Sequence, residues 1–189
     1  MSAQDSKLFV ISGPSGAGKG TLVTRVRELR SNLGLTVSAT TRAPRKGEVD
    51  GVNYFFLTRE EFDRRVANGE FIEWAEVHGN CYGTLVSEVT SKLASGASLI
   101  LEIDVQGALQ VKERFPEAVL IFIKPPSLEV LRERLVGRGT ETPETIELRM
   151  ANAADELALA DRYDDVVVND DLDRATDELV RVLDMHERN

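Results

Sequence analysis

The sequence predicts an α/β fold: a parallel sheet with helices on both faces. Short apolar runs alternate with segments of helical periodicity along most of the 189 residues. Continuous apolar runs of this length are typical of strands that are buried on both faces, as in a parallel sheet. A glycine-rich stretch also joins the first apolar run to the first helical segment. A chain of this length fits one compact domain with smaller parts inserted into it.

The elements of the core follow from the periodicity in chain order. Apolar, β-prone runs predict strands at residues 8–11, 98–103, 119–123 and 166–168. Helical patterns lie between or after them, at residues 19–30, 105–115, 127–136, 143–159 and 172–186. Thr142 followed by Pro143 predicts a helix start, because a hydroxyl residue caps well and proline suits the first helical position. Ser127 predicts another start in the same way.

Residues 38–92 have a different character and predict an inserted, mixed α/β subdomain. The stretch 38–51 is polar and rich in arginine and glycine. Strands are expected at 54–57 and 71–77, separated by a helix that Thr58 and Glu61 can cap as a box. We expect the core to comprise residues 1–37, 93–130 and 153–189, and a small mobile lid to comprise residues 131–152.

Composition excludes several classes of function. A net charge of −9 argues against a broad nucleic-acid-binding face. No apolar run approaches the roughly 20 residues of a membrane span. The polar residues 1–7 are too short for a signal peptide, so we expect a cytoplasmic protein. The lone Cys81 agrees with a reducing compartment; a spectator thiol is favoured over a nucleophile, although the latter stays open.

The glycine-rich stretch predicts a phosphate-binding loop, and with it a sheet of the P-loop NTPase type. Its glycines let backbone N–H groups turn toward a polyphosphate, and Lys19 can contact the β- and γ-phosphates. The alternative is a turn that only joins strand to helix. The usual hydroxyl residue after the lysine is replaced by Gly20, so Thr21 becomes the candidate for contacting Mg²⁺. The loop comprises Gly13, Pro14, Ser15, Gly16, Ala17, Gly18, Lys19, Gly20 and Thr21.

Two arginines near the start of the subdomain predict a second phosphate site. Arg42 and Arg45 lie three residues apart, with Pro44 between them. The planar guanidinium donates hydrogen bonds in pairs and therefore suits a phosphate. Tyr54 and Tyr82 can add phenolic donors to the same anion. Taken alone, the two arginines could equally be solvated surface charges.

Glu73 predicts a site for a purine base. It lies inside the apolar, aromatic run 71–75, where a buried carboxylate needs strong donors. Guanine offers such a pair on one edge, N1–H and the N2 amino group, and adenine does not. Hydroxyls of Ser38 and Thr84 could serve the O6 or N7 side. The alternative is an edge residue paired with a surface arginine.

Taken together, these motifs resemble those of guanylate kinases over nearly the whole chain. The resemblance is carried by GPSGAGKGT, SATTRAPRKGEVDGVNY, FIEWAEVHGNCYGT, LEIDVQGALQV, GRGTE with its downstream arginine, and VVVNDDLD. It implies that guanine is contacted by Ser38, Glu73, Thr84 and Asp104. It also implies that the GMP phosphate is held by Arg42, Arg45, Tyr54 and Tyr82. Thr84 stands where the family often has serine.

Two further groups of residues complete the expected site. Glu102 and Asp104 follow an apolar strand and should face the ligands at its carboxyl end; Glu102 is a candidate for the acceptor site and for ordering Mg²⁺ through water. One of the two acids could instead cap the next helix. In the lid, the resemblance assigns phosphate contacts to Arg138 and Arg149, which Arg134 can join, whereas Arg132 is expected on a solvated face. Asn169 and Asp170 resemble the segment beside the adenine of ATP.

The resemblance implies reversible, Mg²⁺-dependent transfer of the ATP γ-phosphoryl group to GMP, and to dGMP. Lys19, Arg42, Arg138 and Arg149 are then the expected catalytic residues. Neither a nucleic acid nor a membrane is an expected partner, and a homo-oligomer stays open. Two alternatives are a non-catalytic binding module of the same fold and a kinase for another monophosphate.

Overall fold

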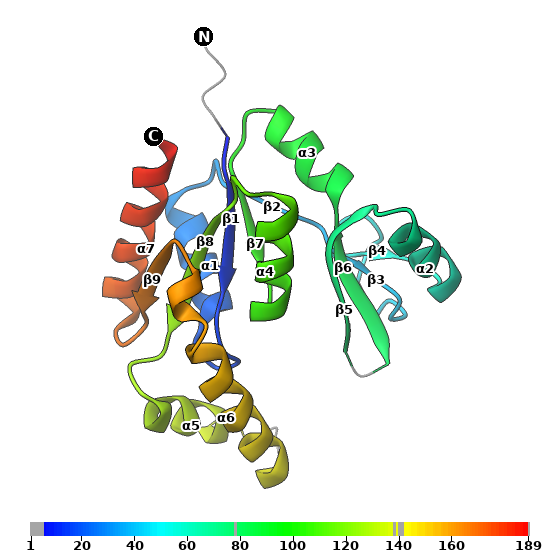
Figure 1. The fold of residues 1–189 in the computed structure, drawn as a ribbon. Coiled ribbons are helices and arrows are strands. Elements are labelled where there is room, and N and C mark those ends of the chain that lie inside the picture. The colour runs from blue at the N-terminus through cyan, green and yellow to red at the C-terminus, as the bar shows by residue number, and fades with distance from the viewer. Residues whose placement is uncertain (1–5, 78, 138, 140–141, 189) are drawn as a thin grey trace.

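The core of the molecule is a five-stranded parallel sheet (Figure 1). The computed structural model describes residues 6–77, 79–137, 139 and 142–188. The strand order is β2-β7-β1-β8-β9, and every neighbouring pair in this sheet is parallel. This confirms the predicted fold class. The strands are β2 (Gly34–Leu35), β7 (Leu99–Glu102), β1 (Leu8–Ser12), β8 (Val119–Lys124) and β9 (Asp165–Val168).

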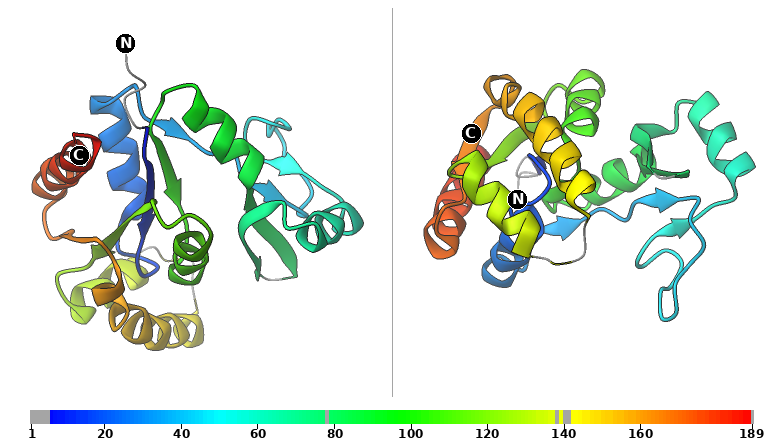
Figure 2. Two further views of the ribbon diagram at one scale, coloured as in Figure 1. Left: turned by 45° about the horizontal axis from the view of Figure 1, so that its top comes forward. Right: turned by 90° about the horizontal axis from the view of Figure 1, so that it is seen from below.

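Helices cover both faces of this sheet (Figures 1 and 2). Along β1, Phe9 and Ile11 belong to one buried cluster and Leu8 and Val10 to another, as the alternation of side chains in a strand requires. The first cluster includes residues of α1 (Lys19–Leu29) and α7 (Leu172–Glu187). The second includes residues of α3 (Val86–Ala94) and α4 (Val105–Arg114). A central strand with two covered faces explains why its sequence is apolar throughout.

Residues 38–92, called the insertion below, form a second sheet beside the core (Figure 1). Its strand order is β4-β3-β6-β5. Phe62 and Phe71 stack in its small apolar core, with ring centroids 4.3 Å apart. Thr58 Oγ1 accepts the Glu61 N–H at 3.1 Å and caps the helix as expected. The elements are β3 (Ala39–Thr40), β4 (Phe55–Phe56), α2 (Arg59–Ala67), β5 (Phe71–Val77) and β6 (Asn80–Leu85), followed by α3.

Residues 131–152 are called the lid segment below. Residues 131–137 and 143–152 of this segment belong to two packed helices that lie below the carboxyl ends of the core strands in Figure 1. They are α5 (Leu128–Gly137) and α6 (Pro143–Leu157). Leu131, Leu135 and Ala153 form a buried cluster of their own. Thr142 caps α6 and Pro143 stands in its first turn, as predicted. A 3₁₀ turn at Ala160–Arg162 then leads to β9.

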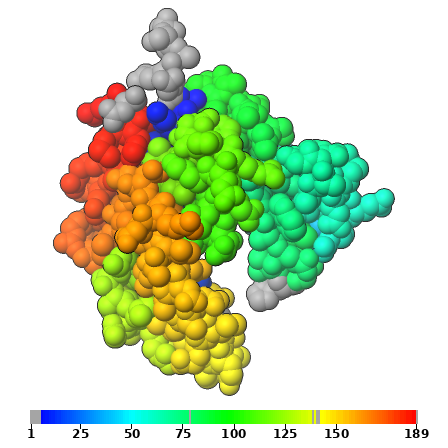
Figure 3. Space-filling model, viewed as in Figure 1, coloured from blue at the N-terminus to red at the C-terminus, as the bar shows by residue number. Residues whose placement is uncertain are grey.

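The sequence patterns missed β2, β3, β6 and α3. Two of these strands are only two residues long, which is too short for any periodicity. The space-filling view shows an open indentation between the insertion and the core with its lid segment (Figure 3). Within the described part of the chain, the structure contains no helix that is long and apolar enough to cross a membrane.

Candidate active site

The glycine-rich loop lies between the carboxyl end of β1 and the first turn of α1. Lys19 Nζ donates to the carbonyl oxygens of Gly13 at 2.6 Å and Pro14 at 3.1 Å, so the ammonium group lies over the loop. Gly18 precedes α1 with a φ of 90°, a conformation that favours glycine. The loop therefore has the strand-turn-helix context that a phosphate-binding loop requires.

Asn169 supports this loop from the end of β9. Its side chain is buried, and its Nδ2 donates to Ala17 O at 2.7 Å. A Cβ on Gly18 would stand 2.4 Å from the same Nδ2, so only glycine allows this approach. Arg134 of α5 donates to Asn169 O at 2.8 Å. Loop, β9 and lid segment are thus connected through one asparagine.

Two hollows open beside the loop. One has a volume of about 410 Å³, and the other, of about 330 Å³, extends along the loop toward β7. They share Gly16, Gly18 and Thr21, so a ligand that occupies both would pass over the loop. The first is lined by Gly16, Gly18, Thr21, Arg134, Asn169, Asp170 and Leu172. The second is lined by Ser15, Gly16, Gly18, Lys19, Gly20, Thr21 and Glu102.

Glu102 places a carboxylate at the end of β7, beside the loop. Burial raises its pKa, and the nearby charge of Lys19 opposes that rise. A Cβ on Gly20 would lie 3.5 Å from Glu102 Oε1, in ordinary contact. Gly20, which replaces the usual hydroxyl residue after the loop lysine, therefore faces this carboxylate. Thr21 lines the same hollow with an exposed side chain.

Glu73 and Thr84 lie opposite each other on β5 and β6. Glu73 is 6% exposed, and its pKa is raised to about 7, mainly by burial and further by the charge of Asp104. Thr84 Oγ1 is buried without a well-aligned hydrogen-bond partner among the described residues, although its proximity to Glu73 opposes part of the rise in pKa. Asp104 Oδ1 accepts the Gly107 N–H at 2.9 Å, so this acid does cap α4. A buried carboxylate and a buried hydroxyl with unused bonding capacity are typical of a ligand site.

The predicted phosphate residues of the insertion also come together. The guanidinium carbon of Arg42 lies 5.5 Å from the centroid of the Tyr54 ring, whose centroid is 6.2 Å from that of Tyr82. Arg45 is exposed at the edge of this cluster. Ser38 lies directly before β3, and its carbonyl accepts the Phe55 N–H at 2.9 Å. Three of the four residues that resemble a GMP phosphate site thus form one group.

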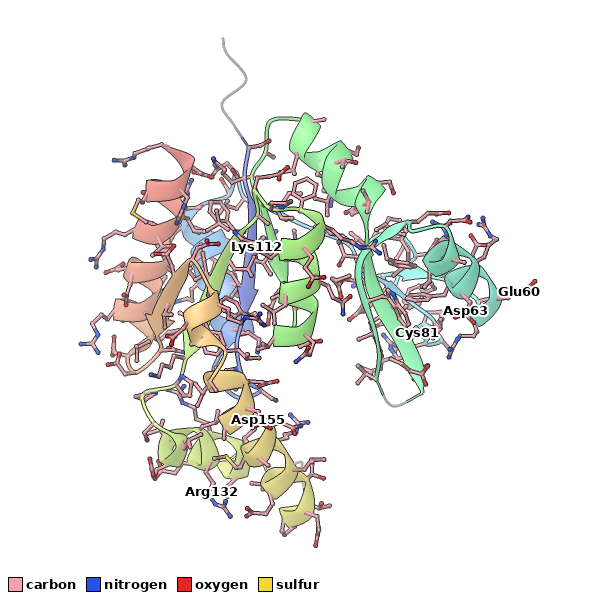
Figure 4. The ribbon with its side chains drawn as sticks, viewed as in Figure 1. Glu60, Asp63, Cys81, Lys112, Arg132 and Asp155 are labelled. Carbon is pink, nitrogen blue, oxygen red and sulfur yellow. The ribbon has the colours of Figure 1, made fainter. Side chains whose placement is uncertain are left out.

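The lid segment contributes two described arginines to the loop. Arg134 Nη1 donates to Ala17 O at 3.5 Å. Arg149 Nη1 donates to Ser15 Oγ at 2.5 Å. Arg138 lies outside the described residues. Arg132 is half exposed, is paired with Glu147 and lies on the outside of the lid segment, on the solvated face expected for it (Figure 4).

Sequence reasoning missed two carboxylates near these groups. Glu48 accepts hydrogen bonds from Arg42, and its place directly after the arginine-rich run was an available signal. Glu156 of α6 is partly buried; burial raises its pKa, Lys19 lowers it and Asp104 raises it. The influence of Lys19 and Asp104 shows that Glu156 lies near the same site. Its position in a regular amphipathic helix gave no sequence signal.

Known proteins of one family match this chain over nearly its whole length. The family model described as guanylate kinase matches residues 5–186. A guanylate kinase of Gloeobacter violaceus is 56% identical over 178 residues, which cover 94% of this chain and 87% of the relative. One of Halalkalibacterium halodurans is 52% identical over 183 residues, which cover 97% and 90%.

A solved structure agrees with the sequence relatives. The crystal structure of guanylate kinase from Anaplasma phagocytophilum superimposes with a TM-score of 0.75 at 36% identity. The match covers 98% of this chain and 88% of that one. With a family match over nearly its full length, relatives more than 50% identical and a shared fold, this chain belongs to the guanylate kinase family.

Proposed function

We propose that this chain transfers the γ-phosphoryl group of ATP to GMP, or to dGMP, and catalyses the reverse reaction. The observation that carries the proposal is the buried carboxylate of Glu73 beside the buried hydroxyl of Thr84. One carboxylate can accept both N1–H and the N2 amino group of guanine. Adenine would leave this carboxylate unpaired, and a site built on such bonds can reject the wrong base by roughly 10⁴-fold.

The acceptor lies in the insertion. Glu73, Thr84, Ser38 and Asp104 contact its base. Its phosphate is bound by the group around Arg42, namely Arg42, Arg45, Tyr54 and Tyr82. The guanidinium of Arg42 already lies against the Tyr54 ring, so it loses little freedom when the phosphate binds.

The donor lies over the glycine-rich loop. Backbone N–H groups of residues 16–20 and the Lys19 ammonium surround its phosphates. Its adenine occupies the hollow beside Asn169 and Arg134. The two hollows at the loop share Gly16, Gly18 and Thr21, which suits a ligand with a base at one end and a polyphosphate at the other.

The residues beside the loop fit Mg²⁺. Glu102 and Thr21 supply a carboxylate and a hydroxyl, and oxygen ligands are those that Mg²⁺ prefers. The described residues contain no group of three or more His, Cys, Asp and Glu that could hold a metal. We expect the ion to be held largely by substrate phosphates and water, as Mg²⁺ is at other nucleotide sites. When bound, the ion would neutralise charge on the phosphate oxygens.

Catalysis follows from charge and alignment. The two substrates repel each other, and the transition state spreads negative charge over the transferred group. Lys19, Arg42, Arg149 and Arg138 neutralise this charge, and closure of the lid segment excludes water. No residue has to form a covalent intermediate. We place the reaction in the cytoplasm, without an obligatory protein partner.

Initial rates with GMP, dGMP, AMP, CMP and UMP, each with ATP and Mg²⁺, test the proposal. We expect ADP release with the two guanine nucleotides alone, and loss of this preference in Glu73→Gln. Equal rates with AMP would contradict the acceptor assignment. No ADP release with any acceptor would indicate a binding module. Unchanged turnover in Arg138→Ala would remove the role of that arginine.

A further inference from the structure

Glu48 lies in the loop between β3 and β4 that also carries Arg42 and Arg45. Arg42 Nη2 donates to Glu48 Oε1 at 2.9 Å and to Oε2 at 3.0 Å. The backbone N–H of Arg45 donates to the same Oε2 at 2.6 Å. In return, the Glu48 N–H donates to Arg45 O at 3.0 Å and closes a turn. One carboxylate therefore joins the side chain of one arginine to the backbone of the other.

The pair of Arg42 and Glu48 is shielded. Their side chains are only 16% and 20% exposed. The Arg42 guanidinium also lies 5.9 Å from the centroid of the Phe56 ring, and its Nη1 donates to Ala43 O at 2.8 Å. The hydrogen bond from Arg42 holds the pKa of Glu48 below its ordinary value, so Glu48 is ionised at neutral pH. An ion pair held this way restricts the guanidinium, unlike an exposed pair whose side chains move freely.

A carboxylate beside a phosphate site has two opposing effects. Its negative charge repels the phosphate, whereas its hydrogen bonds hold the arginine in one orientation. Arg42 compensates the charge of Glu48 directly. Glu48, Ala43 and Tyr82 each engage the guanidinium. A guanidinium has more N–H donors than Glu48 and Ala43 use, so it can also donate to a second anion. We expect orientation to outweigh repulsion.

We propose that Glu48 is a positioning residue, which holds the Arg42 side chain and the Arg45 backbone in the arrangement that binds the phosphate of the acceptor nucleotide. The inference rests on the proposed function, which identifies that anion as the phosphate of GMP. It assigns Glu48 no contact with the substrate. Its effect passes through Arg42 and Arg45.

Glu48→Gln tests the proposal, because glutamine keeps the size but loses the charge and one acceptor oxygen. We expect the KM for GMP to rise about tenfold, with the KM for ATP within about twofold of the parent protein. The kcat should fall by a smaller factor, because Arg42 stays in place and still neutralises charge on the transferred group. Inhibition by guanosine, which has no phosphate, should be unchanged. Glu60→Gln removes the same charge on the outer side of α2 (Figure 4) and should change none of these values.

A double-mutant cycle identifies the route of the effect. In an Arg42→Ala background, Glu48→Gln should weaken GMP binding much less than it does in the parent protein, because only the bond to the Arg45 N–H is left to lose. Glu48→Asp keeps the charge but has a shorter side chain. Its KM for GMP should lie between those of the parent protein and Glu48→Gln. An unchanged or lower KM for GMP in Glu48→Gln would overturn the proposal. It would also be overturned if guanosine binding weakened as much as GMP binding, or if the effects of the two substitutions were additive in the cycle.

These outcomes are separable from failure of the proposed function. Absence of GMP turnover in the parent protein would overturn the proposed function. GMP binding by calorimetry would then still compare Glu48→Gln with the parent. Equal binding of GMP by both proteins, or none by either, would overturn the role of Glu48.

Discussion

The carboxylate of Glu73 lies directly against the backbone of Gly107, in the first turn of α4. A Cβ on Gly107 would stand 3.2 Å from Glu73 Oε2. Two further contacts continue along the same face of the helix: the Trp74 N–H donates to Gln110 Oε1 at 3.3 Å, and Arg114 Nη1 donates to Phe71 O. A helix of the core therefore positions the strand of the insertion that carries the predicted base-contacting residue.

Gly107→Ala should weaken GMP binding without unfolding the protein. Alanine favours the helix by about 1 kcal/mol over glycine, but its methyl group would displace the Glu73 carboxylate. We expect a rise of about tenfold in the KM for GMP and an unchanged KM for ATP. Steady-state kinetics measure both, and Gln106→Ala, at an exposed position of the same turn, is the control. Equal KM values for GMP in the two variants would contradict this role of Gly107.

Glu73 should make the stability of the free protein fall as the pH rises toward neutrality. Its folded pKa of about 7 lies above the ordinary value of 4.5, so the folded state binds the proton more tightly. The stabilisation is complete below about pH 4.5 and is lost as the pH rises through about 7. Relative to Glu73→Gln, the parent protein should lose about 3 kcal/mol of unfolding free energy across this window. Urea denaturation of both proteins at several pH values measures the difference, and parallel curves would refute it.

The same ionisation should control binding of the base. Only the ionised carboxylate accepts both guanine donors, so guanosine should bind about tenfold more tightly at pH 8 than at pH 6. Guanosine is the better probe because the phosphate of GMP itself titrates near pH 6. Calorimetry should show this pH dependence in the parent protein and a flat profile in Glu73→Gln. A flat profile in both would show that Glu73 is not the titrating group.

Asn169→Ala should weaken ATP binding selectively. The substitution removes the short bond to the carbonyl of Ala17 and leaves it only the longer one from Arg134 Nη1, at 3.5 Å. We expect a cost of about 1 kcal/mol in stability. The loop then loses its support, and the KM for ATP should rise while guanosine binding is retained. Asn169→Asp is the sharper variant, because it places a carboxylate oxygen against that carbonyl. Steady-state kinetics and thermal unfolding together test the prediction. A larger rise in the KM for ATP, or a larger loss of stability, in Asn169→Ala than in Asn169→Asp would contradict it.

Arg149→Ala should slow the chemical step. Its guanidinium lies at the loop, with Nη1 2.5 Å from Ser15 Oγ. The proposed function places the transferred group, and the charge that develops on it, beside this loop. We expect kcat to fall on the order of 10³-fold, with little change in the KM for GMP. Arg132→Ala is the matched control, since this arginine lies on the outer face of the lid segment (Figure 4). Similar losses in both variants would mean that a general loss of positive charge, and not position, explains the effect.

Long elements of the fold could be predicted from the sequence, because their periodicity reflects burial. The predicted strand 71–77 coincides with β5, and the caps at Thr58 and Thr142 form as expected. The strand β6 was missed because Asn80–Leu85 mixes polar and small residues, and its pairing with β5 is a tertiary feature. The helix α3 was missed because it begins directly at the end of β6, with no capping side chain.

The same distinction between local patterns and tertiary contacts applies to the candidate site. Local motifs identified the glycine-rich loop, and the structure brings Arg42, Tyr54 and Tyr82 together. Contacts between distant segments could not be predicted from the sequence, because they depend on how the elements pack. The bond between Asn169 and Ala17 spans 152 positions, and nothing in either segment indicates the other. The substrate roles of these residues stay predictions until the variants are measured.

The place where the insertion joins the core has an evolutionary consequence. The chain leaves the core sheet at its edge strand, β2, and returns at β7, to which β2 is hydrogen-bonded. Both junctions therefore lie on one side of the sheet, and the intervening stretch is continuous in the gene. A single recombination event could exchange most of the acceptor-selecting surface and leave the donor half intact. New specificities can arise on this scaffold by replacement of a cassette, without step-by-step revision of the core.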